Sequence, residues 1–177
     1  YRNMALTKIN NNTLSAVTGL PAGVGGKVLQ VVSTTKTDTF SATSNMTDIT
    51  GLSVAITPSS TSNKILIIVQ VHIVGDNSGT AVRLLRNSTD LALGDASGSR
   101  GRFTMIGTYA GDTPAQYSSG ANHINYLDSP NTTSATTYKL QGGSYSSTFY
   151  INQTKYDSNN LNASRASSTI TVMEIGA

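Results

Sequence analysis

Alternation of apolar and polar residues predicts β-strands along much of the chain. The clearest stretch is 64–74, KILIIVQVHIV, in which every second residue from Ile65 to Ile73 is aliphatic. Side chains of a strand point alternately to its two faces, so this aliphatic set forms one face and is expected in the core. The other face mixes aliphatic with polar side chains. Such a mixture suits a central strand whose outer side meets another subunit or a loop.

Turn residues separate further β-branched runs from Lys27 onward, at intervals of roughly 8 to 15 positions, as in a sandwich or jelly roll. Segments 52–57 and 64–74 are expected to pair as a hairpin, because Pro58 begins a turn between them. No stretch predicts a long helix. The prediction is an all-β fold, an antiparallel β-sandwich or jelly roll over residues 27–177. The expected strands are Val28 to Thr34, Phe40 to Thr43, Leu52 to Thr57, Lys64 to Val74, Ala81 to Arg86, Phe103 to Tyr109, His123 to Leu127, Thr136 to Leu140, Phe149 to Asn152 and Thr169 to Ile175.

Residues 1–26 precede this domain and carry few residues of the kind that fill a core. They end in a glycine-rich stretch with one proline, from Gly19 to Gly26, which indicates a boundary. We expect an extended N-terminal arm or linker that serves attachment or exchange with a neighbouring subunit, or else a plain disordered terminus. Met4 is a candidate initiator, in which case Tyr1 to Asn3 are upstream sequence.

The composition favours a folded domain that stays soluble through hydroxyl and amide groups. Of the 177 residues, 37% are hydrophobic and only 12% are charged, while 23 are serine and 25 are threonine. Disordered chains usually combine low hydrophobicity with high net charge, whereas this chain has dense aliphatic runs and a net charge of +3. Its 12 basic residues are scattered, so nucleic-acid binding is not indicated. No apolar run reaches the roughly 18 to 20 residues of a membrane span, so membrane insertion is not expected.

Residue types that carry catalysis are sparse. The chain has no cysteine, two histidines and no GxSxG motif that would mark a nucleophilic serine. His72 lies inside a strand pattern, where a half-buried or interface position is expected, and His123 has no partner motif. Most of the nine acidic residues occupy turn-like positions rather than pairs, and the GDNSG and GDASG segments lack the further carboxylates of a calcium loop. We therefore expect a protein that is not an enzyme, with no catalytic residue, cofactor or metal site.

Two polar regions, 94–134 and 141–165, are long enough to carry recognition, as loops on a rigid scaffold commonly do. Tyrosine on a polar loop suits stacking on a sugar ring or filling an interface. The alternative is that these tyrosines pack on the flank of their own domain. The candidate glycan or receptor contacts are Arg100, Arg102, Tyr109, Tyr117, His123, Tyr145, Tyr150 and Tyr156.

Four segments are distinctive in combination: GKVLQVVSTTKTDTFSATSNMTDITGLSVAITPSSTSNKILIIVQVHI, LLRNSTDLALGDASGSR, LDSPNTTSATTYKLQ and STITVMEIGA. Together they resemble fibre and tail-fibre-like virion proteins of marine and environmental phages. The likeness covers residues 26–177 in the same order, and GLSVAITPSSTSNKIL with the terminal TVMEIGA is its most specific part. The opening ALTKINNNTL is also similar to the starts of such proteins.

This resemblance implies a virion structural protein on the surface of a phage particle, a short fibre or receptor-binding domain with a jelly-roll-like fold. Its implied partners are copies of itself in a homotrimer, other capsid or tail proteins through the arm, and host surface glycan. The short arm leaves open a capsid or head decoration or connector protein with a purely assembly role, and a polysaccharide depolymerase fits least. Trimerisation has a physical motive too, because the mixed face of 64–74 must be covered. The candidate trimer interface is Leu66, Ile68, Gln70 and His72.

Overall fold

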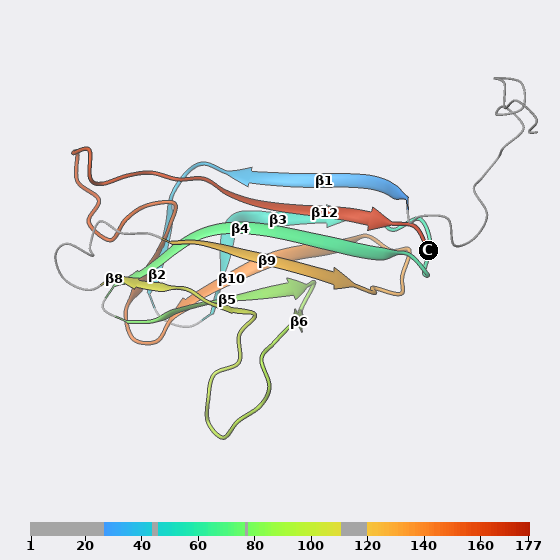
Figure 1. Ribbon diagram of the computed structural model, residues 1–177, viewed down its shortest axis with the longest axis horizontal. Coiled ribbons are helices and arrows are strands. Elements are labelled where there is room, and N and C mark those ends of the chain that lie inside the picture. The colour runs from blue at the N-terminus through green and yellow to red at the C-terminus, as the bar shows by residue number, and fades with distance from the viewer. Residues whose placement is uncertain (1–26, 44–45, 77, 111–119) are drawn as a thin grey trace, which may run out of the picture.

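A computed structural model describes residues 27–43, 46–76, 78–110 and 120–177, and within these ranges every regular element is a β-strand. The strands form two sheets that pack face to face, so the expected all-β sandwich is confirmed (Figure 1). The expected N-terminal arm, residues 1–26, lies outside the described residues, as does Tyr117.

One sheet, which we call sheet A, is built around β4, Lys64–Asp76. On one side β4 pairs with β12 and further along with β11, and on the other side it pairs with β9 and then, in parallel, with β8. β1 lies beside β12, and β2 lies beside β11. β4 is therefore central, as its mixed second face predicted. The other strands of sheet A are β1 (Val28–Lys36), β2 (Phe40–Thr43), β8 (Thr108–Ala110), β9 (Gly120–Asp128), β11 (Thr148–Ile151) and β12 (Ser168–Ile175).

The other sheet, sheet B, has the order β3-β10-β5-β6, with β7 also beside β5. All of its pairings are antiparallel. The two short strands β6 and β7 pair along β5, and the loop 92–104 between them extends away from the sandwich (Figure 1). The strands of sheet B are β3 (Thr47–Ile56), β5 (Thr80–Arg86), β6 (Thr89–Leu91), β7 (Met105–Ile106) and β10 (Thr136–Ser144).

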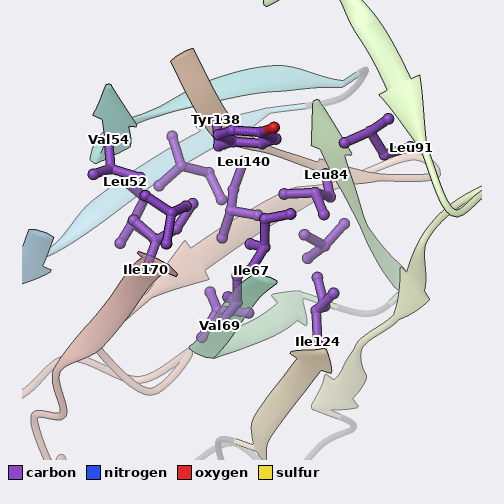
Figure 2. Close-up of a cluster of buried hydrophobic side chains, with 14 of the residues drawn as sticks. Leu52, Val54, Ile67, Val69, Leu84, Leu91, Ile124, Tyr138, Leu140 and Ile170 are labelled. Atoms are coloured by element: carbon purple, nitrogen blue, oxygen red, sulfur yellow. The ribbon is translucent and has the colours of Figure 1, made fainter. Parts of the chain in front are cut away.

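Side chains from the two sheets meet in a single core. Figure 2 shows Ile67 and Val69 of β4 directed toward residues of sheet B such as Leu140. Tyr138 and Phe149 are the largest side chains that are fully buried. Burial of apolar surface, worth about 25 cal/mol per Å², is the main term that stabilises such a sandwich. The aliphatic face predicted for β4 is confirmed, since each of its members is at most 1% exposed: Ile65, Ile67, Val69, Val71 and Ile73.

The expected hairpin between residues 52–57 and 64–74 is wrong. β3 pairs with β10 in sheet B while β4 lies in sheet A, so residues 57–63 cross from one sheet to the other. Both strands bury one apolar face. A hairpin would lay these faces side by side on one sheet, whereas the sandwich places them on two sheets, and β3 packs against β1 and β12.

The segment 103–109, expected as one strand, contains two. β7 belongs to sheet B and β8 belongs to sheet A, and Gly107 stands at the crossing. The N–H of Gly107 donates to the carbonyl oxygen of Thr80 at 2.8 Å. A Cβ at this position would overlap Thr80 Oγ1 and would lie 2.9 Å from Cγ2 of Ile73. Only glycine lets the chain pass this close, so the strand pattern breaks here.

The two ends of the described chain meet at one end of the sandwich. The N–H of Gly176 donates to the carbonyl oxygen of Lys27 at 2.8 Å, and β1, β4 and β12 bring Val28, Lys64 and Ile175 together there. We call this the terminal end. The opposite, distal end is where β4 finishes, and it carries the turns at 76–79 and 144–147 and the loop 152–167 (Figure 1).

Candidate functional site

Three of the candidate tyrosines lie at the distal end, around the last residues of β4. Tyr145 follows β10 and is 92% exposed, and Tyr150 lies on β11, which pairs with this part of β4. Tyr156 is 51% exposed and follows Lys155, whose Nζ lies 2.8 Å from Oδ1 of Asp76. Two exposed phenol rings, a combination suited to stacking on sugar rings, therefore belong to one end of the molecule.

The loop 152–167 also carries a polar hollow of about 420 Å³. Within it, Nη2 of Arg165 donates to both carboxylate oxygens of Asp157, at 2.7 and 2.8 Å. Because this ion pair neutralises its own charges, the hollow offers hydrogen-bonding groups with little net charge. Such a lining suits a neutral hydroxylated ligand better than an ionic one. The lining residues are Asp157, Ser158, Asn159, Asn160, Ala163 and Arg165.

Asn152 fixes the start of this loop to the sandwich. It is fully buried with a φ of 61°, and its Nδ2 donates to the carbonyl oxygens of Lys36 and Asp38, at 2.9 and 3.0 Å. Its Oδ1 accepts a hydrogen bond of 2.6 Å from Oγ of Ser168, and its N–H donates to the carbonyl oxygen of His72 at 3.1 Å. The base of the loop is thus rigidly held by β1, β4 and β12.

The two candidate arginines lie elsewhere, in the loop 92–104. Nη1 of Arg100 donates to Oγ of Ser97 at 2.9 Å, and Nε of Arg102 donates to the carbonyl oxygen of Gly94 at 2.7 Å. Each guanidinium group therefore braces its own loop through one of its nitrogen atoms. This loop leaves the β5 edge of sheet B and does not join the distal tyrosines in one site (Figure 1).

The candidate interface residues share the outer face of sheet A. The register sets Leu127 of β9 and Met173 of β12 directly on either side of Leu66. The apolar part of this face is accessible, because Ile68 is 38% exposed and Leu127 is 48% exposed. The side chains on this face are Val31 and Ser33 of β1, Thr169, Thr171 and Met173 of β12, Leu66, Ile68, Gln70 and His72 of β4, and His123, Asn125 and Leu127 of β9.

The two histidines are neighbours on this face. His123 stands opposite Gln70, which places it diagonally from His72, and Nε2 atoms of Gln70 and His72 lie 3.3 Å apart. Nδ1 of His72 is buried and has no hydrogen-bond partner among the described residues. Burial lowers the pKa of His72, and the charge of His123 beside it lowers that pKa further. The His72 side chain is therefore held neutral at pH 7.

The outer face of sheet B differs, because ion pairs cross it. Nζ of Lys139 lies 2.7 Å from Oδ2 of Asp48, and Nε2 of Gln141 donates to Oδ1 of Asp48 at 2.8 Å. These two bonds, with that of Lys139 the stronger influence, lower the pKa of Asp48. Nη1 of Arg83 lies 3.7 Å from Oδ2 of Asp90. Permanent charges of both signs make this a solvated face.

Two buried acids were not among the residues that the sequence singled out. Asp128 is 4% exposed and accepts hydrogen bonds from Arg86 of β5 and Tyr138 of β10. Glu174 is fully buried and takes part in no ion pair within the described ranges. Glu174 shares a period-two face with Val172, so the alternation in STITVMEI could have placed it inside; no local signal marks Asp128. Both acids join separate strands, and neither faces a hollow.

In the ranges that the structure describes, no three or more His, Cys, Asp or Glu residues gather so that they could hold a metal ion. Those ranges also contain no helix long and apolar enough to cross a membrane.

The candidate glycan contacts thus fall into separate groups rather than one site. Tyr145, Tyr150 and Tyr156 belong to the distal end, and His123 belongs to the outer face of sheet A. Tyr109 lies on β8 at the distal end by its backbone, and its side chain lies outside the described part. No protein-family model and no curated protein matches the sequence.

Proposed function

We propose that this chain is a structural and host-adhesion domain on the surface of a phage particle, a homotrimer that is not an enzyme and uses no cofactor. The observation that carries the proposal is that the N-terminal attachment and the exposed tyrosines lie at opposite ends of the domain. Lys27, to which residues 1–26 are joined, lies at the terminal end, and the exposed tyrosines lie at the distal end. A module attached through its N-terminal arm would present the distal end outward. The likeness to phage fibre proteins supports the same assignment.

The chemistry of the distal end suits weak recognition of host glycan. Tyr145 and Tyr156 offer exposed rings, and the hollow between Asp157 and Arg165 offers hydrogen-bonding groups. A single site of this kind binds weakly, because it is shallow and open. Several copies on one particle raise the overall avidity by orders of magnitude without any new contact, so a shallow site suffices for adhesion.

A second candidate function is a head-decoration or connector protein that binds only other virion proteins. The accessible apolar face of sheet A favours it, because such a patch marks a protein contact rather than a sugar site. Under this alternative the distal tyrosines would have no ligand. A polysaccharide depolymerase is the least supported candidate.

Glycan arrays and isolated host polysaccharide, probed with the whole chain, separate these functions. We expect binding that falls about tenfold when Tyr145→Ser and Tyr156→Ser are combined, since each aromatic contact is worth about 0.5 to 1.5 kcal/mol. Arg100→Ser is the matched control, and it should leave binding unchanged. A larger loss with Arg100→Ser would move the site to the loop 92–104.

The same samples test the alternatives. Binding to particles that lack the protein, without binding to any glycan, would replace adhesion by an assembly role. Release of reducing sugar from host polysaccharide would replace it by an enzyme.

A further inference from the structure

The outer face of sheet A combines exposed apolar side chains from three neighbouring strands. Val31 of β1 is 54% exposed, Ile68 of β4 is 38% exposed and Leu127 of β9 is 48% exposed. Leu66 and Met173 lie between them in the register. Contiguous apolar side chains of this kind mark a contact surface, since monomeric proteins rarely leave them open to water.

The charges of this face indicate what covers it. Between Leu66 and His72, neither β4 nor the opposing residues of β9 and β12 place an Asp, Glu, Lys or Arg on the face. In a closed symmetric assembly a residue near the axis meets its own counterparts, so a permanent charge there would repel itself. A face without such charges fits a second copy of the same chain. The outer face of sheet B, with its ion pairs, does not.

His72 and His123 are the two histidines of this face, and they lie toward its distal end, beyond the row of Leu66. Directly opposite His72, β9 contributes Ala121. His123 of β9 and the uncharged Thr169 of β12 stand opposite Gln70, diagonally from His72. Farther along β4 on the same face lies Asp76, paired with Lys155. At about 3.3 Å per residue it stands about 13 Å from His72. Within β4, β9 and β12, no other carboxylate lies on this face; the loop 152–167, joined to His72 by Asn152, carries Asp157, which is paired with Arg165.

From these observations we infer that the outer face of sheet A, from the row of Leu66 to that of His72, is an acid-labile contact between copies of this chain. The inference rests on the homo-oligomer of the proposed function, and it adds the surface and its regulation. Near neutral pH the His72 imidazole is uncharged, and the apolar side chains farther along the face are buried against the neighbouring copy. In acid each copy brings the positive charge of His72 into the contact, where it is desolvated and is repelled by its counterparts. The copies then separate.

Sedimentation of the whole chain at about pH 7.5 and about pH 5 tests this inference. The acid pH lies well below the ordinary histidine pKa of about 6.5, because the pKa of His72 is lowered. We expect an association constant at least about tenfold lower at the acid pH. If the pKa of one histidine differs by one unit between the separate and the associated chain, the association constant changes by about tenfold. The double variant His72→Gln/His123→Gln keeps polar side chains but cannot titrate. It should associate equally, within about twofold, at both pH values. Circular dichroism at each pH checks that the domain stays folded.

A second pair of variants tests the surface itself. Ile68→Glu should abolish association at neutral pH, whereas Leu161→Glu, at a site in the loop 152–167 that is 96% exposed, should not. Association that survives Ile68→Glu would overturn this surface and leave the homo-oligomer standing. Equal association of the natural chain at both pH values would overturn the acid lability alone. A monomer at neutral pH would overturn both the surface and the homo-oligomer of the proposed function, and binding to another virion protein instead would then identify the occupant.

Discussion

The carboxylate of Glu174 accepts a hydrogen bond of 2.6 Å from the side-chain amide of Asn63, and this bond joins β12 to the segment that crosses between the sheets. The same carboxylate accepts from the N–H of Ser59 at 2.6 Å, from Oγ of Ser59 at 2.8 Å and from Nε2 of Gln30 at 2.5 Å. Asn63 in turn accepts from the N–H of Ala177 at 3.1 Å. A buried negative charge is thus held entirely by neutral donors, and they tie the terminal end together.

Glu174→Gln should therefore destabilise the domain, although the two side chains have the same shape. The substitution removes the charge that strengthens four hydrogen bonds and turns an amide N–H₂ toward other donors. We expect a loss of about 2 to 4 kcal/mol in the free energy of unfolding by urea. Asp157→Asn is the control, because the surface pair with Arg165 is worth at most about 1 kcal/mol. Equal losses in the two variants would contradict this account.

Acid should destabilise the domain through the same carboxylate. Burial opposes ionisation of Glu174, but the hydrogen bonds from Asn63, Gln30 and Ser59 outweigh it and lower its pKa from 4.5 to about 2. The folded state then binds fewer protons than the unfolded state, so the stabilisation is complete above about pH 4.5 and is lost as the pH falls toward 2. Urea unfolding across this interval, at one protein concentration, should give a flatter pH dependence for Glu174→Gln. A curve parallel to that of the natural chain would refute the assignment.

In the cluster of Arg86, Asp128 and Tyr138, substitutions of the arginine and of the tyrosine should lower the free energy of unfolding by different amounts. Nη1 of Arg86 lies 2.8 Å from both oxygens of Asp128, and the Tyr138 hydroxyl donates to Oδ2 at 2.7 Å. Arg86→Ala leaves a buried carboxylate without its cation and should cost about 3 kcal/mol or more. Tyr138→Phe removes one hydrogen bond and should cost about 1 to 2 kcal/mol. Thermal unfolding would contradict this order if the phenylalanine variant were the less stable one.

Asn152→Ala should lower the free energy of unfolding by more than the strain of its backbone conformation alone. Asn152 and the exposed Asn131 both have positive φ, 61° and 51°. Alanine at either position strains the backbone by about 1 kcal/mol. At Asn152 it also leaves two carbonyl groups and the Ser168 hydroxyl without their partner. We expect Asn152→Ala to cost at least about 2 kcal/mol more than Asn131→Ala in urea unfolding. Faster proteolysis within the loop 152–167 should accompany it.

Period-two alternation was sufficient to predict most strands and the buried face of β4. It could not predict that β3 and β4 belong to different sheets, because alternation shows that a face is buried without showing what covers it. The break at Gly107 was missed for a related reason: the close approach of Thr80 and Ile73 is a tertiary contact. The same limit applies to function. Tyr145, Tyr150 and Tyr156 lie in one polar region, 141–165, but nothing local in the sequence shows that Tyr109 of the other region joins them while Arg100 and His123 do not.

Gly75 and Gly79 provide a final, matched test at the distal end. A Cβ on Gly75 would overlap the carbonyl oxygen of Ser78 and would lie 2.7 Å from Cγ2 of Thr80, whereas a Cβ on Gly79 meets no atom within 4 Å. The Ser78 oxygen belongs to the backbone that carries the chain from sheet A to sheet B, so it can move only if this crossing moves.

Gly75→Ala should therefore cost at least about 2 kcal/mol, while Gly79→Ala should change stability by less than about 1 kcal/mol. Both variants stiffen the unfolded chain equally, so the difference between their free energies of unfolding isolates the contact in the folded state. β8 and β11 flank Gly75, and the distal tyrosines depend on this junction. Glycan binding should consequently weaken in Gly75→Ala and persist in Gly79→Ala. Equal stability of the two variants would show that the crossing adapts to a methyl group and that the junction is not rigid.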